Sequence, residues 1–250
     1  MIKPKKSLSQ NFLIDKNISK KIVNLTKITN DIIIEIGPGT GNLTDEIIKN
    51  KPKKLVLIEK DKSLYSLLKK KYNNDKKIEL INIDVLDYDF DKIKVPFKII
   101  SNLPYNISTK IIFKILKLKI NIIEMIFMIQ KEVAKKMYYK NNIKKNRLNC
   151  FIAITSNYHI EFDVSKNVFF PKPKVDSTIV KIIPKKNNNY DLYKFEEFTR
   201  KLFNNKRKKI SFFIKKNKLN KNKLDINVIN KRAEDLKIEE ILEIFNQFYI

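Results

Sequence analysis

The chain has 250 residues, of which 43% are hydrophobic, so it is long enough to bury a core and is not a disordered polymer. Its 53 Lys and Arg residues exceed its 27 Asp and Glu residues, giving a formal net charge of +26, which predicts a polyanionic partner such as nucleic acid. The excess is mainly Lys in a chain also rich in Asn and Ile. This bias is typical of an A/T-rich genome, so charge alone does not identify the partner.

Residue counts exclude several classes of site. The single cysteine, Cys150, leaves no disulfide or cysteine-based zinc site, and the single histidine, His159, leaves no multi-histidine metal site. We expect both to be packing residues and predict no metal. No apolar run reaches the roughly 20 residues of a membrane span, and the N-terminus lacks the apolar stretch of a secretory signal. The sequence therefore predicts a soluble, cytoplasmic protein without membrane contact.

Short apolar runs of strand type alternate with helical periodicity over the first three quarters of the chain. The strand-type runs lie at 31–36, 53–59, 77–88, 96–102, 121–130, 159–170 and 176–184, and the helical segments at 17–28, 42–50, 62–72, 109–118 and 131–139. The pattern at 147–158 fits a helix or a strand. Alternation of this kind predicts an α/β fold with parallel strands at the centre of the sheet.

A polar stretch at 184–191 resembles a linker, and the remainder is helical by periodicity at 193–203, 206–216 and 238–248. The sequence therefore predicts two domains, an α/β domain at 1–186 and a small, all-helical, Lys-rich domain at 187–250.

All the glycines of the chain lie in one loop, at Gly37, Gly39 and Gly41, between a predicted strand and a predicted helix. Such a loop lets the backbone approach a ligand closely, and a helix N-terminus offers unpaired N–H donors. Glu59 ends the next apolar run and suits a ribose, and Asp84 is expected to end the third strand, where it can accept from an adenine amine. Because the spacing is neither of the two common phosphate-binding patterns, S-adenosylmethionine (SAM) fits better than NAD. A tight turn with two surface acids is the alternative.

The sequence Asn102-Leu103-Pro104-Tyr105 follows the fourth predicted strand. Pro104 has no N–H, so the turn is expected to aim carbonyl oxygens and the Asn102 amide oxygen outward, as acceptors for an exocyclic amine. Tyr105 offers a ring on which a base can stack. The alternative is a surface turn with a half-buried tyrosine.

A second aromatic cluster, Phe169-Phe170, precedes a rigid Pro-Lys-Pro segment. It is predicted to form the opposite face of a base sandwich, since an extruded base is held by stacking and edge hydrogen bonds. The alternative, a core plug at the sheet edge, fits Phe170 better than Phe169.

Basic runs at 206–209 and 215–216 lie in the C-terminal helical region and are interleaved with Phe212 and Phe213. They can track RNA phosphates, or they are a solvated lysine face. Because arginine is scarce and binds phosphate in a fixed geometry, it is expected to make the more specific contacts. The predicted RNA-binding residues are Arg147, Lys206, Arg207 and Lys208, with Arg232 as a further candidate.

Six motifs together resemble a known family, the small-subunit ribosomal RNA adenine dimethyltransferases. They are KSLSQNFLID, IEIGPGTGNLT, LVLIEKD, NIDVLDYDF, ISNLPYNIST and FFPKPKVDS, and they occur in the family's order. The tail segments FNNKRKKI and KRAEDLKIEE extend the resemblance over essentially the whole chain. The resemblance implies a Rossmann-like SAM-dependent methyltransferase domain followed by the helical domain. It also implies dimethylation of N6 in two adjacent adenosines near the 3′ end of small-subunit rRNA.

The resemblance also implies residue roles and partners. SAM would be bound by Asn11, Leu13, Gly37, Gly39, Glu59, Asp84 and Asn102. The target amine would be bound by Asn102, Leu103 and Pro104, and the base clamped by Tyr105 and Phe169. The partner would be rRNA of the immature small ribosomal subunit, and the protein a monomer.

Four positions depart from the family's pattern: Ser9, Lys110, Lys172 and Lys206. None carries a predicted chemical role, but Ser9 replaces a glycine and Lys206 an arginine that contacts RNA in this interpretation. Two alternatives stay open. One is a large-subunit rRNA adenine methyltransferase of the macrolide-resistance type, and the other is a ribosome-assembly factor with little catalysis.

Overall fold

The computed structural model describes residues 4–5, 10–118, 121–140, 142–186, 189–205, 207–221 and 224–249. The chain folds into two compact units, one of Met1–Lys135 with Tyr158–Pro184 and the other of Lys136–Asn157 with Lys185–Ile250. Residues 136–157 thus belong with the helical unit, although they precede the last strand of the sheet. The domain boundary at 186 stays a prediction.

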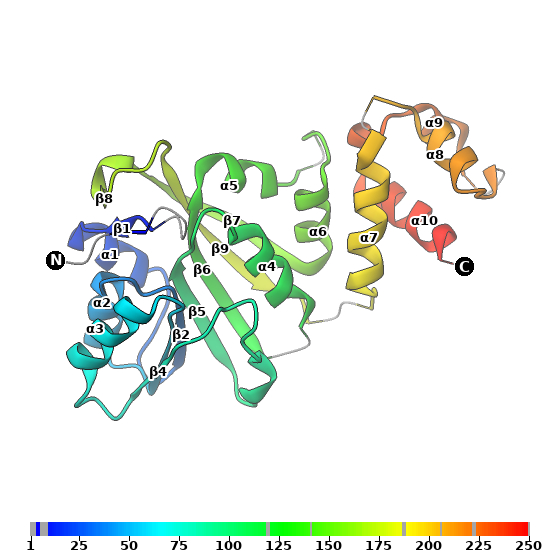
Figure 1. Ribbon diagram of the computed structural model, residues 1–250. Helices are drawn as coiled ribbons and strands as arrows, with labels where there is room; N and C mark the ends of the chain where they lie inside the picture. Colours follow the sequence, from blue (N-terminus) through cyan, green and yellow to red (C-terminus); the bar gives the residue numbers. More distant parts are fainter. Residues whose placement is uncertain are drawn as a thin grey trace. The chain divides into compact units, whose positions relative to one another are not determined.

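The first unit is built on a seven-stranded sheet in the order β4-β3-β2-β5-β6-β9-β7 (Figure 1). Its strands are β2 (Ile32–Ile36), β3 (Lys54–Ile58), β4 (Ile78–Ile81), β5 (Phe97–Asn102), β6 (Ile122–Gln130), β7 (Ser156–Val164) and β9 (Ser177–Pro184). The pairs from β4 to β6 are parallel, whereas β9 runs antiparallel to β6. The predicted α/β fold with central parallel strands, Rossmann-like and followed by C-terminal helices, is confirmed.

The helices of this unit are α1 (Lys16–Val23), α2 (Asn42–Lys49), α3 (Lys62–Tyr72), α4 (Ser108–Lys117) and α5 (Lys131–Met137). Asp15 and Asp61 cap α1 and α3, since each carboxylate accepts backbone N–H bonds from the first turn. The N-cap of α2 is Gly41, whose backbone is left-handed at φ 84°, and no side chain caps this helix.

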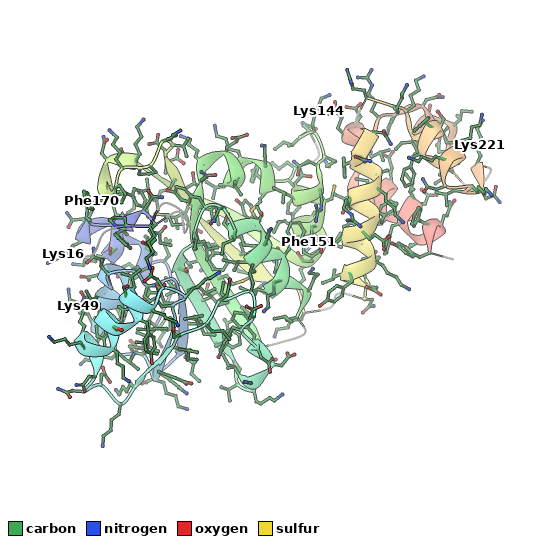
Figure 2. The ribbon with its side chains drawn as sticks, viewed as in Figure 1. Lys16, Lys49, Lys144, Phe151, Phe170 and Lys221 are labelled. Carbon is green, nitrogen blue, oxygen red and sulfur yellow. The ribbon has the colours of Figure 1, made fainter. Side chains whose placement is uncertain are left out.

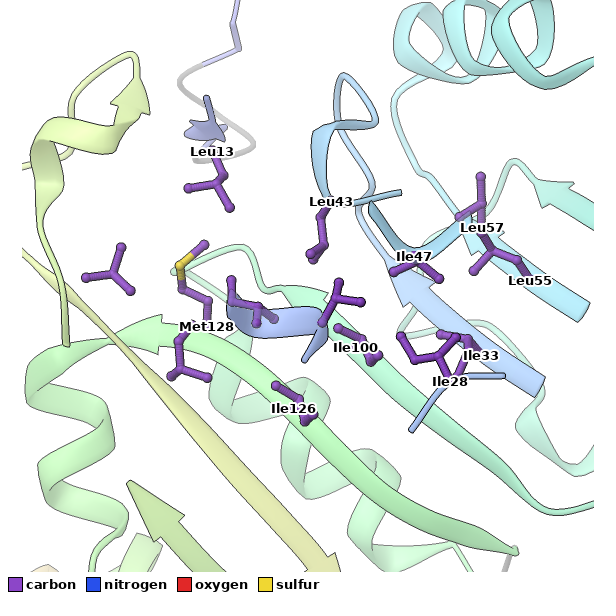
Figure 3. Close-up of a cluster of buried hydrophobic side chains, with 14 of the residues drawn as sticks. Leu13, Ile28, Ile33, Leu43, Ile47, Leu55, Leu57, Ile100, Ile126 and Met128 are labelled. Carbon is purple, nitrogen blue, oxygen red and sulfur yellow. The ribbon is translucent and has the colours of Figure 1, made fainter. Parts of the chain in front are cut away.

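Alternate residues of the strands face α1 and α2 and form the core that Figure 3 shows. Leu55 and Leu57 of β3 lie in this cluster with Ile100 of β5, and Leu43 and Ile47 of α2 pack on them. The intervening strand residues, such as Val56 and Ile99, are buried as well. Burial on both faces explains why these parallel strands are continuous apolar runs in the sequence.

A second, two-stranded sheet joins the N-terminus to the aromatic motif. In it β1 (Phe12–Leu13) runs antiparallel to β8 (Phe169–Phe170), with Phe12 opposite Phe170 and Leu13 opposite Phe169. This pairing places residues 10–13 beside the glycine loop.

The helical unit contains α6 (Arg147–Thr155), α7 (Leu192–Leu202), α8 (Ile210–Lys216), α9 (Ile226–Asn230) and α10 (Ile238–Phe248). The rings of Phe195, Phe198, Phe213, Phe245 and Phe248 pack against one another as its core. Among the described residues, no helix has both the length and the apolar character needed to cross a bilayer.

Several sequence-based expectations need correction. The ambiguous segment 147–158 is helix α6 and then the start of β7. The helix predicted at 17–28 ends at Val23, and the third strand ends at Ile81, three residues before Asp84. Cys150 is buried as expected, but His159 is exposed on β7, so it is not a packing residue.

Candidate active site

A cavity opens at the carboxyl ends of β2, β3 and β5, where ligands bind in parallel α/β sheets. Ten predicted site residues line it: Asn11, Leu13, Gly37, Gly39, Glu59, Asp84, Asn102, Leu103, Pro104 and Tyr105. They come from five separate segments of the chain. The sheet topology therefore brings together residues that the sequence keeps up to 94 positions apart.

The glycine loop forms one wall of the cavity. Gly39 has φ +61°, and a Cβ atom built there would lie 2.9 Å from Cδ1 of Phe12. A carbon at that distance overlaps the ring, so a side chain at position 39 and the ring of Phe12 cannot occupy their present places together. Gly37 also has a positive φ, +65°, but a Cβ atom there would meet only Pro104, at an ordinary 3.9 Å.

The N-terminal segment is fixed to the other walls by hydrogen bonds to its backbone. Nδ2 of Asn42 donates to the carbonyl of Leu13 at 2.6 Å, and Nδ2 of Asn102 donates to the carbonyl of Asn11 at 3.1 Å. Residues 11–13 therefore close the cavity between the start of α2 and the end of β5.

Asp61 also binds the N-terminal segment. One carboxylate oxygen caps α3, and the other accepts from Gln10 at 3.3 Å and pairs with Lys5 at 2.8 Å. Burial alone raises the pKa of Asp61, but the hydrogen bonds from Lys5 and from the α3 backbone outweigh it and lower the pKa. The carboxylate of Asp61 is therefore held ionised, and it pairs with the ammonium group of Lys5.

Two acids face the cavity after β3 and β4. The buried carboxylate of Glu59 accepts from the N–H of Asp61 at 2.8 Å and from that of Gly39 at 3.4 Å, and burial raises its pKa. A carboxylate has about four acceptor sites, so Glu59 can still accept from hydroxyl groups. Asp84 pairs with Lys60 at 2.7 Å. Partial burial raises the pKa of Asp84, but the bond from Lys60 outweighs it and lowers the pKa.

A third acid, Glu35, also lines the cavity and was missed by sequence reasoning. It is fully buried in β2 and accepts from Oγ1 of Thr44 at 2.6 Å. Desolvation raises the pKa of Glu35 to about 8. The sequence does contain a feature that could have indicated Glu35, because this acid is the one charged residue in the apolar run IIIEI.

The turn after β5 contains two acceptor oxygens to which no described residue donates. Because the carbonyl of Asn11 can only accept, the Asn102 amide must point its NH₂ there, which leaves Oδ1 without a hydrogen bond to any other described residue. The carbonyl of Pro104 accepts from the N–H of Ile107 at 3.2 Å. The carbonyl of Leu103 accepts from no described residue. This pair of free oxygens is what an exocyclic amine needs.

The aromatic residues divide between cavity and core. Tyr105 lines the cavity, and its hydroxyl lies 2.6 Å from Oγ of Ser177. Phe169 is only 3% exposed and packs with Leu13, whereas Phe170 is 58% exposed and is labelled on β8 in Figure 2. The structure therefore reverses the expectation that a core plug fits Phe170 better than Phe169. Phe169 does not line the cavity, and its role as a clamp stays a prediction.

Lys114 supports the loop that follows Asp84. Its Nζ lies 3.2, 2.6 and 2.8 Å from the carbonyl oxygens of Val85, Leu86 and Tyr88. Burial lowers the pKa of Lys114, although nearby aspartates oppose this effect. Since Asp84 and Val85 line the cavity, Lys114 fixes one of its walls from α4.

The predicted RNA-binding residues lie in the helical unit. Arg147 pairs with Glu196 of α7, and Arg207 and Lys208 are exposed near the start of α8. Lys206 lies outside the described residues, as does the departure at Ser9. The RNA contacts of these residues stay predictions.

Comparison with known proteins places the whole chain in one family. Residues 1–249 match the family model described as ribosomal RNA adenine dimethylase. The chain belongs to this family. It is an rRNA adenine dimethyltransferase, as the motifs predicted.

The chain is similar to relatives that are named ribosomal RNA small subunit methyltransferase A. The one from Malacoplasma penetrans is 43% identical, covering 98% of this chain and 92% of its own, and the one from a Sulfurihydrogenibium species is 41% identical, covering 98% and 96%. Among solved structures, a dimethyladenosine transferase from Plasmodium falciparum has a TM-score of 0.78 at 27% identity, covering 96% of this chain and 98% of its own. A 23S rRNA methyltransferase, with a TM-score of 0.74 at 22% identity, shares the fold.

Proposed function

We propose that this enzyme uses SAM to dimethylate N6 of two adjacent adenosines near the 3′ end of small-subunit rRNA. The observation that carries the proposal is the orientation of the Asn102 amide. Its NH₂ is held by Asn11 and its oxygen is free at the edge of a cavity that also contains Glu59.

The cavity fits SAM in its hydrogen-bonding groups and in its apolar lining. The space beside Gly37 is not crowded by neighbouring side chains, Glu59 retains acceptor sites for the two ribose hydroxyls, and Asp84 lies where a purine amine can donate. Leu13, Leu43 and Ile58 give the cavity an apolar lining. When bound, SAM supplies a methyl group on a positively charged sulfur.

Asn102 and Leu103 then prepare the target amine. An adenine amine is a weak nucleophile because its lone pair is delocalised into the ring. Oδ1 of Asn102 and the carbonyl of Leu103 would accept the hydrogens of this amine and leave its lone pair free to attack. SAM, when bound, would supply the methyl group, whose bond to sulfur breaks as its bond to nitrogen forms, and the proton released from nitrogen would leave to water. Orientation of this kind supplies a large part of a rate enhancement.

Tyr105 is proposed to stack on the target base. Its hydroxyl bond to Ser177 fixes the ring at the cavity edge, so the ring is positioned before the base arrives. Burial raises the pKa of the Tyr105 hydroxyl, although the bond to Ser177 opposes this, so the ring stays neutral. The predicted second ring, Phe169, is buried beside Leu13, so its side chain must turn outward to meet a base.

The small ribosomal subunit is proposed as the substrate because the relatives at about 40% identity carry that subunit in their names. The likeness to the 23S rRNA enzyme, at 22% identity, is evidence for the fold alone. The net charge of +26 is compatible with an RNA surface. We propose that the enzyme acts as a monomer in the cytoplasm, on a maturing small subunit.

Methyl transfer from labelled SAM tests the substrate directly. Small and large ribosomal subunits are prepared from cells that lack the respective adenine methylations and are offered separately. The proposal predicts label in the small-subunit RNA only. Label in the large subunit would support the macrolide-resistance type, and tight binding without label would support the assembly factor.

A further inference from the structure

The helical unit has a cavity of its own, between the end of α7, the turn η4 (Phe203–Asn205) and α8. Leu202, Ile210, Phe213 and Ala233 form its apolar floor, and all four are buried. The remaining lining residues are polar or basic apart from Phe212. The cavity thus combines an apolar floor with a polar edge, as small-ligand sites do.

The edge of this cavity is cationic. Lys201, Lys208, Lys209 and Lys216 line it, and none of the described residues in its lining carries a carboxylate. Lys201 pairs with Glu197 at 2.7 Å, but none of the other three forms an ion pair with another described residue. Three lysines that line one cavity and pair with no described carboxylate suit an anionic ligand with more than one oxygen, such as a phosphodiester.

Phe212 is an aromatic ring exposed among these cations. Its side chain is 43% exposed, and Nζ of Lys208 lies 5.9 Å from the ring centroid. Leaving a phenyl ring in water is unfavourable, and a flat ligand that covers it gains burial. Aromatic rings beside phosphate-binding lysines are the arrangement on which single-stranded nucleic acids stack their bases.

Three amides complete the edge. Nδ2 of Asn217 donates to the carbonyl of Phe213 at 2.8 Å, which leaves its oxygen as an acceptor. The side chains of Asn204 and Asn205 are exposed and make no hydrogen bond with the described residues. Since an amide offers both donors and acceptors, this set matches the edge of a nucleobase rather than a bare phosphate.

We propose that this second cavity binds one unpaired nucleotide of the rRNA substrate, with the base on Phe212 and its phosphates near Lys208 and Lys216. The inference rests on the proposed rRNA substrate but concerns a contact outside the cavity for SAM. It differs from a lysine surface that tracks phosphates, because a base inside a double helix cannot reach the Phe212 ring.

The chain contains no tryptophan, so Phe212→Trp places a single tryptophan, which can be excited selectively over tyrosine, in the cavity. A matched control is Ile226→Trp, at a side chain of α9 that is 65% exposed and does not line the cavity. A single-stranded RNA of about twelve nucleotides is titrated into each full-length variant, followed by the same RNA as a perfect duplex. We expect the single strand to quench the fluorescence at position 212 several-fold more than at 226, and the duplex to quench both equally.

Methylation of small subunits provides a second readout. Phe212→Ala is expected to raise KM for the subunit by about tenfold with kcat and SAM affinity unchanged, because stacking contributes strongly per base. Phe212→Tyr, which keeps a ring, and Ile226→Ala are expected to match the wild type. Thermal unfolding shows whether each variant is folded.

Equal quenching at 212 and 226 by the single strand, or stronger quenching at 212 than at 226 by the duplex, would overturn the inference. An unchanged KM in a folded Phe212→Ala variant would overturn it as well. Failure of the proposed function is distinguishable, because the wild type itself would then leave small subunits unmethylated.

Discussion

The side-chain amide of Asn102 donates to the backbone carbonyl of Asn11 at 3.1 Å, across 91 positions of the sequence. This bond fixes which end of the amide faces the cavity, and it joins the N-terminal segment to the turn that holds the target amine. The cofactor side and the base side of the site are therefore coupled through one side chain.

Asn102→Asp is expected to damage both sides of the site. A carboxylate cannot donate to the Asn11 carbonyl, so the two oxygens repel and the N-terminal segment loosens. We expect kcat for methyl transfer to fall by roughly a hundredfold or more, since loss of orientation has effects of that size, and SAM affinity to weaken. Single-turnover transfer and calorimetric titration with SAM measure the two effects. A variant with wild-type SAM affinity would show that the bond to Asn11 does not support the cofactor site.

The ring of Phe12 is expected to distinguish two alanine substitutions in the glycine loop. Gly37→Ala and Gly39→Ala both place a side chain at positive φ, which costs about 1–2 kcal/mol, but only Gly39→Ala overlaps Phe12. Gly39→Ala should therefore reduce the free energy of unfolding further. Adding Phe12→Ala should recover that difference in the Gly39 variant and not in the Gly37 variant. Urea unfolding of the double-mutant cycle tests this coupling, and additive effects would contradict it.

Lys114→Met is expected to weaken SAM binding without contacting SAM. It removes the donor of three carbonyl groups in the loop after Asp84, so the wall of the cavity loses its support. We expect KM for SAM to rise by about tenfold, the size of one lost hydrogen bond to a charged group, with kcat nearly unchanged. Lys110→Met, at an exposed position of the same helix, is the control. Equal kinetics for the two variants would refute a supporting role for Lys114.

Glu35 is expected to make stability depend on pH. Burial raises its pKa to about 8 in the folded protein from an ordinary value of 4.5, so the folded state holds the proton more tightly than the unfolded chain. The contribution of Glu35 to the free energy of unfolding is therefore fully present below pH 4.5 and is lost as the pH rises to about 8. Glu35→Gln should lose stability less steeply than the wild type between about pH 5 and pH 8. Urea unfolding at several pH values measures this difference. If the free energy of unfolding of the wild type and of Glu35→Gln changed equally with pH over that range, the effect of burial on Glu35 would be contradicted.

The sequence could predict elements whose signal is local. The helix at 238–248 was predicted at both ends because its apolar residues keep a strict helical spacing, and α10 has these bounds. The cavity residues after β2, β3 and β5 were also predictable, because parallel strands bring their carboxyl ends together. By contrast, the N-cap of α2 depended on the left-handed backbone of Gly41, which no capping side chain announces.

Contacts between distant segments were beyond such reasoning. Adjacent residues of a strand face opposite sides, so whether Phe169 or Phe170 is buried depends on the pairing of β8 with β1. That pairing joins two-residue strands more than 150 positions apart, and neither has a pattern of its own. The pairs of Asn102 with Asn11 and of Lys114 with the loop after Asp84 were missed for the same reason.

Mass spectrometry of the 3′ fragment of small-subunit rRNA tests the central claim most directly. Small subunits that lack dimethyladenosine are incubated with SAM and either the wild type or Asn102→Ala. The account predicts two adjacent N6,N6-dimethyladenosines with the wild type and neither with the variant, whose thermal unfolding should remain cooperative. Dimethyladenosine formed equally by Asn102→Ala, or absent from this fragment with the wild type, would contradict it.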